Sequence, residues 1–297
     1  MIECVPNVSE GRRTAVVERI AGAIRSTADV ALLDYSSDPA HHRSVYTMVG
    51  SPSSLRMALL ALFDEALRHI DLRQHRGVHP RLGAVDVVPF IPLEDASMDE
   101  CITLAREVGA AIAERFQLPV FLYEAAATTP ERRRLEVIRQ GQFEGLSEKM
   151  RRPEWLPDFG PGHPHPTAGA TVVGARGPLI AFNVNLATAD LEVAQAIAAS
   201  IRSSGGGLPS LKAMGVALPD RGHVQVSMNL TDYATTSMVQ AFEEVQSHAR
   251  RLGVDVRDSE LVGLVPRAAL TVQDAGRLRI RGFTEERILE HRIERLR

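Results

Sequence analysis

The sequence predicts an α+β (α/β) fold class with two ferredoxin-like subdomains, each of the order βαββαβ, facing each other across a cleft. The first observation is length, because 297 residues allow two domains of ordinary size. The second is composition, since 44% hydrophobic and 24% charged residues suit a protein with a full apolar core. The third is that one order of strands and helices occurs twice. We therefore expect an N-terminal subdomain at 1–176 and a C-terminal subdomain at 177–297, with a ligand in the cleft between them.

In the first half, short strands alternate with helices whose apolar residues recur every three or four positions. Val16, Ile20 and Ile24 have this spacing, which is typical of one face of a helix. The stretch 85–91 has the length and character of a buried strand. The predicted elements are strands at 2–8, 30–34, 44–49, 85–91 and 120–123, helices at 12–25, 53–70 and 98–116, and a polar loop at 35–42.

The second half repeats this pattern. A turn with Asp220 and Gly222 joins two strands of similar length. The predicted elements are strands at 179–185, 211–218, 224–230 and 260–265, helices at 191–201 and 238–252, and a charged C-terminal helix at 284–297. The loop 203–209 contains three consecutive glycines, and both a plain solvent loop and a ligand gate fit it.

The segment 151–174 between the halves is rich in proline and glycine and contains the only tryptophan, Trp155. A plain linker would be more polar and would not need Trp155 or Phe159. We therefore predict a crossover segment that packs over the cleft.

Composition and charge exclude several classes of protein. The formal net charge of −3 gives no indication of nucleic-acid or membrane-surface binding. The sequence has no apolar stretch long enough to span a membrane, and its N-terminus does not resemble a signal peptide, so we expect a cytoplasmic protein. Cys4 and Cys101 are then expected to be reduced thiols. Lys149 and Lys212 are the only lysines, so arginine forks are expected to hold substrate anions.

The loop at 75–83 is the strongest candidate for catalysis. Gly77 and Pro80 oppose a helix, so the loop leads His79 and Arg81 to the start of the strand at 85–91. An imidazole that titrates near neutral pH, beside a guanidinium, suits a proton-transfer site with an anion anchor. A loop histidine that only binds a neighbouring carbonyl is the simpler alternative.

Known metal and nucleotide motifs do not fit this sequence. Three histidine pairs (His41 and His42, His75 and His79, His163 and His165) accompany Asp34 and Asp38, but their spacing matches no recognised metal site, and we predict no metal. The chain also lacks a phosphate-binding loop, a dinucleotide fingerprint and a GxSxG nucleophile motif.

Polar residues alternate along two strands of the second half. Asn183 and Asn185 interrupt one apolar strand, and Gln225, Ser227 and Asn229 share one face of another. A solvent-facing sheet and a ligand groove for an amide-rich or pterin-like molecule both explain this pattern.

Five blocks of the sequence, in order along nearly the whole chain, resemble the glutamate formimidoyltransferase family, the formiminotransferase part of formiminotransferase–cyclodeaminase. The blocks are ECVPNVSEG at 3–11, HPRLGAVDVVPFIP at 79–92, DFGP at 158–161, GATVVGARGPLIAFNVNL at 169–186 and QVSMNL at 225–230. The resemblance implies two α/β subdomains around a folate-binding tunnel and a homodimer. It implies transfer of a formimino group from N-formimino-L-glutamate to N5 of tetrahydrofolate, which yields 5-formiminotetrahydrofolate and L-glutamate in histidine degradation.

The resemblance also implies roles for individual residues. His79 corresponds to the catalytic histidine, Asp34 is expected to orient or tune its imidazole, and Arg43 and Arg81 are candidates for the glutamate carboxylates. Asn7 and Glu10 are further substrate-binding candidates. The folate-binding candidates are Asp158, Phe159, Gly160, Pro161, Gly162, His163, Pro164, His165, Pro166, Thr167, Asn183, Asn185, Gln225 and Asn229.

Tetrahydrofolate is expected to act as a co-substrate, with no tightly bound cofactor. The sequence does not continue into a helical cyclodeaminase domain, so a separate cyclodeaminase is expected downstream. Two alternatives stay open: another folate one-carbon enzyme, such as an ATP-dependent enzyme acting on 5-formyltetrahydrofolate, and a non-catalytic folate-binding protein.

Overall fold

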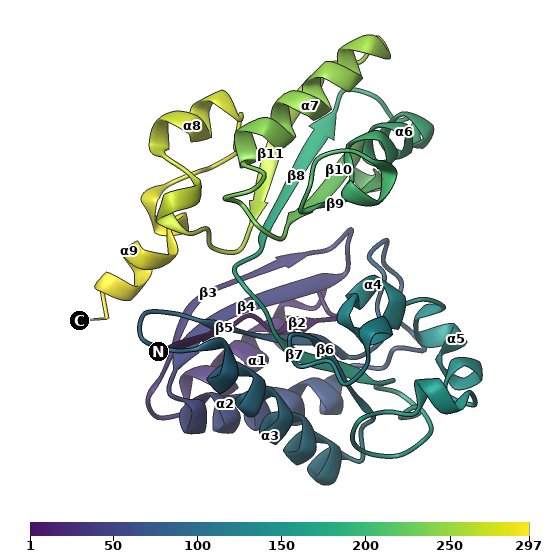
Figure 1. Ribbon diagram of the computed structural model, residues 1–297, viewed down its shortest axis with the longest axis vertical. Coiled ribbons are helices and arrows are strands. Elements are labelled where there is room, and N and C mark those ends of the chain that lie inside the picture. Colours follow the sequence, from purple (N-terminus) through teal and green to yellow (C-terminus); the bar gives the residue numbers. More distant parts are fainter. Residues whose placement is uncertain (297) are drawn as a thin grey trace. The chain divides into compact units, whose positions relative to one another are not determined.

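The computed structural model describes residues 1–296 and divides into two compact units, Met1–Arg176 and Gly177–Arg297, which are described separately (Figure 1). Each unit has its own sheet and its own apolar core.

The sheet of the first unit has the strand order β3-β4-(β1, β2)-β5-β7-β6. Its strands are β1 (Ile2–Cys4), β2 (Asn7–Val8), β3 (Val30–Asp38), β4 (Arg43–Gly50), β5 (Val85–Pro92), β6 (Val120–Glu124) and β7 (Thr171–Ala175). β1 and β2 occupy one position, between β4 and β5, and pair antiparallel to both. The four positions from β3 to β5 are the ferredoxin-like arrangement, and β7 and β6 extend it with parallel pairing.

Three helices cover one face of this sheet: α1 (Thr14–Arg25), α2 (Pro52–His69) and α3 (Met98–Phe116) (Figure 1). α3 begins with a capping box, in which the Ser97 side chain and Glu100 satisfy each other's backbone N–H. The core under these helices includes Phe63, Phe90 and Ile112.

The opposite face of the first sheet is apolar only in part. Beneath α4 (Leu135–Ile138) and α5 (Gln142–Lys149), a smaller cluster joins Phe121 to Ile138 and Leu146. Elsewhere on this face, buried side chains such as Arg43 and Asp86 are polar. Buried charges are stable only when they have partners, so we expect these side chains to pair with one another in a polar site.

The second unit has a four-stranded antiparallel sheet of the order β11-β8-β10-β9. The strands are β8 (Ile180–Leu186), β9 (Leu211–Leu218), β10 (His223–Leu230) and β11 (Val256–Val262), and the helices are α6 (Leu191–Ile201), α7 (Met238–Arg251), α8 (Val272–Arg277) and α9 (Leu289–Glu294). Phe182, Val226 and Phe242 lie in its core, on the face that α6 and α7 cover (Figure 1). The strand order equals that of β3 to β5, so the predicted pair of ferredoxin-like units is confirmed.

Three predicted boundaries in the units are wrong. Pro6 has no N–H for a sheet ladder, and the predicted first strand is divided into β1 and β2. The predicted polar loop at 35–42 is strand as far as Asp38, because Ser36 and Ser37 pair with β4 and only the residues that follow make the turn. The last strand is Val256–Val262 and not 260–265.

The predicted crossover at 151–174 is wrong at its C-terminal end. Thr171–Ala175 is β7, which lies in the sheet between β5 and β6 and pairs parallel to both. Trp155 packs beside the smaller apolar cluster, with Lys149 Nζ 3.7 Å from its ring centroid.

The C-terminal segment is helical over a shorter range than predicted. A 3₁₀ turn at Glu285–Arg287 precedes α9, and Arg297 lies outside the described residues. Within residues 1–296, none of the helices combines the length and the apolar character that crossing a membrane requires.

Candidate active site

The non-helical face of the first sheet carries a polar group that we call the first polar face: Asn7, Arg43, His79, Asp86 and Arg139. Asn7 pairs with Val87 of β5, whereas the next residue, Val8, pairs with Val85. Asp86 is therefore the extra residue of a β-bulge. Bulges redirect side chains, and here a fully buried carboxylate results.

Asp86 accepts four hydrogen bonds. Its Oδ1 accepts from the backbone N–H groups of Leu82 (2.6 Å) and Gly83 (3.3 Å). Its Oδ2 accepts from Arg43 Nη1 (2.8 Å) and Arg139 Nη2 (2.5 Å). Burial alone would raise the pKa of Asp86, but the two guanidiniums and the backbone donors lower it well below its ordinary value. Asp86 is therefore ionised.

Within the first polar face, His79 lies beside Arg43 and is half-buried. Its Nδ1 is 2.7 Å from the carbonyl oxygen of Pro80 and 3.1 Å from Arg43 Nη1. One ring nitrogen cannot donate to the carbonyl and accept from the guanidinium at the same time. When Nδ1–H donates to Pro80, Nε2 carries the lone pair and can act as a base.

The surroundings of His79 favour its neutral form. Burial, followed by the charges of Arg43 and Arg139, lowers the pKa of His79 well below its ordinary value, against an opposing effect of Asp86. Burial also lowers the pKa of Arg43 to about 10, so Arg43 remains a cation at neutral pH. Arg43 Nε donates to Asn7 Oδ1 at 2.9 Å, which fixes the guanidinium plane.

Glu10 forms a second buried centre. It accepts from the backbone N–H groups of Arg12 and Arg13 (2.8 and 2.9 Å) and lies 3.3 Å from His42 Nε2. Burial opposes ionisation, but these donors lower the pKa of Glu10 well below its ordinary value. The His42 ring stacks on that of His75, with centroids 4.1 Å apart. Burial lowers the pKa of His75 to about 4.

Arg81, a predicted carboxylate anchor, already has a carboxylate partner. Its two Nη atoms donate to Glu144 of α5 at 2.8 and 2.6 Å, and its Nε donates to His75 Nδ1 at 3.1 Å. The pair is the bidentate arrangement that guanidinium and carboxylate groups favour. Arg81 therefore joins α5 to the His79 loop.

Asp34 lies on the same face of the sheet but away from Arg43. It pairs with Thr47, four residues along β4 from Arg43, which is roughly 13 Å of strand. The register therefore does not bring Asp34 to His79, and Asp86 is the carboxylate that the structure places beside Arg43.

The segment 158–167 begins with a structural aspartate. Asp158 accepts from the backbone N–H of Leu122 (2.7 Å), from Arg132 Nη1 (2.9 Å) and from the Thr128 hydroxyl (2.5 Å). These bonds fix the start of the segment against β6. Gly160 has a φ of +89°, and a Cβ there would lie 2.6 Å from the Leu118 carbonyl oxygen, so this turn requires glycine.

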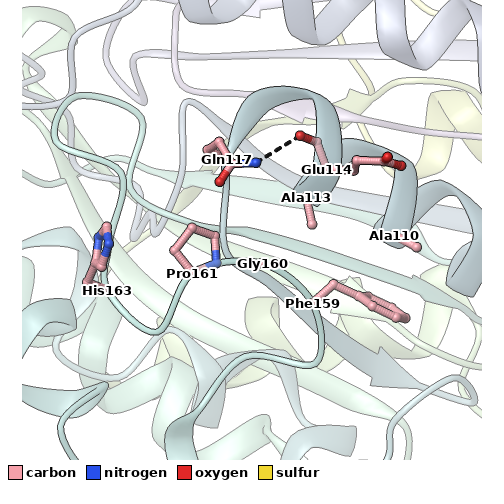
Figure 2. Close-up of a pocket in the computed structure, with 8 residues that line it drawn as sticks. All are labelled: Ala110, Ala113, Glu114, Gln117, Phe159, Gly160, Pro161 and His163. Carbon is pink, nitrogen blue, oxygen red and sulfur yellow. Dashed lines mark hydrogen bonds between the residues drawn. The ribbon is translucent and has the colours of Figure 1, made fainter.

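Part of this segment borders an open pocket at the C-terminal end of α3 (Figure 2). Its lining residues are Ala110, Ala113, Glu114, Gln117, Phe159, Gly160, Pro161 and His163. The walls combine apolar and polar groups, with no deep enclosure. Because α3 covers the helical face, this pocket is separate from the first polar face.

The C-terminal half of the segment lies near the His79 loop. Gly162 and Pro166 are exposed and Pro164 is half-buried. The carbonyl of Thr167 accepts from Leu72 N–H (2.8 Å), and His165 Nδ1 accepts from Ala168 N–H (3.1 Å). The carbonyl of Ala168 in turn accepts from Ala84 N–H at 3.0 Å. Residues 167–168 are thus held beside the start of β5.

The second unit carries the second polar face, on the side of its sheet opposite α6 and α7: Asn183, Asn185, Gln225, Asn229, Asp258 and Glu260. Asn185 Nδ2 donates to Asp258 Oδ1 (2.6 Å), and Gln225 Nε2 donates to Asn185 Oδ1 (2.8 Å). The shared face that period-two alternation predicts is confirmed, since Gln225 pairs with Asn185.

Burial differs along the second polar face. Asn185 and Gln225 are fully buried, Asn183 is nearly so, and Asn229 is exposed. Glu260 accepts from Arg221 Nη1 at 3.0 Å and pairs with Arg281. The amides therefore belong to a charged network.

Sequence comparison decides the family. The formiminotransferase domain, N-terminal subdomain, matches residues 1–176, and the formiminotransferase domain matches residues 181–293. This chain belongs to the formiminotransferase family.

Several relatives of this formiminotransferase chain span nearly all of it. Glutamate formimidoyltransferase of Streptococcus pyogenes serotype M1 is 45% identical, over 99% of this chain and 98% of that protein. Glutamate formimidoyltransferase of Thermoplasma acidophilum is also 45% identical, over the same shares of both chains. Formimidoyltransferase-cyclodeaminase of Rattus norvegicus is 44% identical, over 91% of this chain and 51% of that protein.

Two residues of the candidate active site were missed by the sequence analysis. Asp86 is a charged residue within the HPRLGAVD block and within an apolar strand, and this interruption was the available signal. Arg139 follows the four-residue helix α4 and has no motif around it. Within residues 1–296, no group of three or more His, Cys, Asp or Glu side chains is placed to hold a metal ion.

Proposed function

We propose that this chain is a glutamate formimidoyltransferase. It transfers the formimidoyl (formimino) group of N-formimidoyl-L-glutamate to N5 of tetrahydrofolate. One observation carries the proposal within the family: a neutral His79 whose Nδ1 lies between the Pro80 carbonyl and the Arg43 guanidinium. A base at this position, beside a cation, suits proton transfer during attack on an amidine carbon.

The reaction requires one proton to move twice. N5 of tetrahydrofolate attacks the formimidoyl carbon, a C–N5 bond forms, and a tetrahedral intermediate results. His79 Nε2 accepts the N5 proton and then gives it to the departing glutamate nitrogen, whose C–N bond breaks. The products are 5-formimidoyltetrahydrofolate and L-glutamate. Protonation of the leaving nitrogen matters because an amide-like anion is a poor leaving group.

The charged groups around His79 supply the substrate contacts. Arg43 is the candidate for a glutamate carboxylate, because its cation is fixed by Asn7 and Asp86. Arg81 can bind a glutamate carboxylate only if its ion pair with Glu144 breaks when the substrate binds. Glu10 stays a substrate-binding candidate, and Asp34 stays a candidate for tuning the site electrostatically.

The folate contacts are proposed for the segment 158–167 and for the amides of the second polar face. Their support is the position of residues 167–168 beside the start of β5, where the His79 loop ends, and the hydrogen-bonding capacity of Asn183 and Asn229. Tetrahydrofolate serves as co-substrate, with no tightly bound cofactor. We further propose a cytoplasmic homodimer whose product passes to a cyclodeaminase.

An assay with purified protein tests the function directly. Formimidoylglutamate and tetrahydrofolate are mixed with the protein without ATP, and 5-formimidoyl- or 5,10-methenyltetrahydrofolate is followed by ultraviolet absorbance. ATP-independent product formation supports the proposal. Turnover of 5-formyltetrahydrofolate that requires ATP, or folate binding without turnover, would overturn it in favour of the two alternatives.

A further inference from the structure

Asp86 connects two parts of the candidate active site. Its Oδ1 holds the N–H groups of Leu82 and Gly83, directly after the loop that carries His79. Its Oδ2 holds Arg43, whose Nη1 lies 3.1 Å from His79 Nδ1. A shift of this single carboxylate would therefore move both the loop and the cation beside the imidazole.

Arg139 is the other cation that binds the Asp86 carboxylate, and contacts from distant residues hold it in position. It follows α4, which has four residues and is too short to be stable alone. Lys149 Nζ donates to the carbonyls of Val137 and Ile138 (both 2.7 Å) and lies over the ring of Trp155 in a cation–π contact. A lysine at the end of a helix satisfies its free carbonyls, so this contact fixes the turn that carries Arg139.

We propose that Arg139 is a positioning residue for His79, and that it acts through the carboxylate of Asp86, which it shares with Arg43. The geometry supports this role because Arg139 Nη2 and Arg43 Nη1 donate to the same oxygen, Oδ2. With Arg139 in place, Asp86 is held from two sides and cannot follow Arg43 away from the imidazole. The proposal rests on the function of His79 proposed above.

The charges around His79 give the proposal a measurable consequence. The groups that face its ring are Arg43 from β4, Asp86 from β5, Arg139 after α4, and the His41 ring, whose centroid is 6.0 Å away. Arg139 disfavours the imidazolium, so its loss should raise the pKa of His79. His79 would then become protonated, and stop acting as a base, at a higher pH. The acid limb of the profile of kcat against pH would move to higher pH.

The test compares Arg139→Gln, Arg139→Lys and the wild type in two measurements. The first is kcat against pH. We expect Arg139→Gln to lower kcat about 10- to 100-fold, as a misplaced catalytic group does, and to move the acid limb up by about one pH unit. Arg139→Lys retains the charge and should restore the position of the limb.

The second measurement does not need activity. The pKa of His79 is followed in the free protein by NMR of its ring Cε1–H, which is assigned with His79→Ala. We expect this pKa to rise in Arg139→Gln and to stay near the wild-type value in Arg139→Lys.

Arg132 provides the matched control. It is also a buried arginine on a buried aspartate, with Nη1 2.9 Å from Asp158 Oδ2, and its Nε, like that of Arg139, is buried without a hydrogen-bond partner in the described chain. Arg132→Gln should lower the melting temperature without moving the acid limb of kcat or the pKa of His79.

The outcomes separate the two proposals. If wild-type protein shows no transfer, the proposed function fails, and the NMR titration still decides whether Arg139 controls His79. If His79 titrates alike in wild type and Arg139→Gln, or if Arg132→Gln shifts it as much, the positioning role of Arg139 is wrong. A wild-type kcat profile in folded Arg139→Gln would also overturn it.

Discussion

The two polar faces occupy equivalent sides of two ferredoxin-like sheets but differ in how their acids are held. On the first polar face, Asp86 is fully buried between two guanidiniums and two backbone N–H groups. On the second, Glu260 is half-buried and shares its oxygens with Arg221, Arg281 and the amide of Gln225. Both oxygens of Asp86 are held by hydrogen bonds in a buried position. The oxygens of Glu260 are partly exposed, and its several donors can exchange with one another.

We infer from this difference that the two polar faces have different tasks. A buried, fully satisfied carboxylate holds its neighbours in one geometry, as acid–base catalysis requires. Amides can both donate and accept, so a face lined with them can recognise a ligand with mixed donors and acceptors. An imidazole lies against the fixed centre, so we expect substitutions there to act on kcat, and substitutions among the amides to act on KM.

The largest expected effect on activity comes from His79→Ala. Loss of a general acid–base group typically lowers kcat about 10²- to 10⁴-fold, and KM for tetrahydrofolate should change little. Stability should fall by about 1 kcal/mol, since the substitution removes the contact between His79 Nδ1 and the Pro80 carbonyl. Steady-state kinetics and a thermal melt on one preparation check both points. Wild-type kcat in the folded variant would remove His79 from the mechanism.

The second prediction concerns the acid itself. Asp86→Ala leaves two buried guanidiniums without their carboxylate, so we expect a loss of about 3–5 kcal/mol in the free energy of unfolding. Because the pKa of Asp86 is lowered in the folded protein, its contribution is present above the unfolded pKa of about 4 and is lost as the pH falls through the folded value.

Urea unfolding of wild type and Asp86→Ala at neutral pH and near pH 3 measures both effects. The matched substitution on the second polar face, Glu260→Ala, should cost less, because its carboxylate is only half-buried. Equal losses from both variants would contradict the contrast between a fixed and an exchangeable centre.

The third prediction is a pH dependence confined to the first unit. Burial lowers the pKa of His75 to about 4 from its ordinary 6.5, so the folded state disfavours its protonation. The stability that His75 contributes is therefore complete above 6.5 and decreases as the pH falls towards 4. We expect a change of about 1–3 kcal/mol over this interval. His75→Gln should flatten the curve of unfolding free energy against pH, and parallel curves would contradict this account.

The smallest effect is expected from Asn229→Ala on the second polar face. Asn229 is exposed, so stability should change by less than about 0.5 kcal/mol. Loss of one hydrogen bond to folate should raise KM for tetrahydrofolate about 3- to 10-fold with kcat unchanged. Gln195→Ala, exposed on α6 on the helical side of the same sheet, is the control and should leave KM unchanged. A lower kcat in Asn229→Ala would contradict the division of tasks.

The sequence predicted those features that depend on local periodicity. Asn183 and Gln225 fall on one face because alternation along a strand does not depend on the neighbouring strand. Their partner Glu260 was not predicted, because it comes from β11 and meets them only through the register of the sheet.

The missed parts of the first unit have similar physical reasons. Asp86 interrupts an apolar strand, but its burial results from a bulge, and the bulge depends on the pairing of β2 with β5. β7 has only five residues and follows a segment rich in proline and glycine, so its apolar run was assigned to the crossover. Arg139 is placed by Lys149 and Asp86, both distant in sequence, and its own neighbours predict nothing.

The position of β7 bears on the order in which the chain can fold during synthesis. β5 and β6 are made early, but each pairs with β7 and not with the other. Until residue 175 has left the ribosome, this part of the sheet has a vacant central position and two unpaired strand edges. A nascent chain whose emerged part ends between β6 and β7 should therefore be prone to aggregate through these edges, whereas one whose emerged part includes residue 176 should be less so.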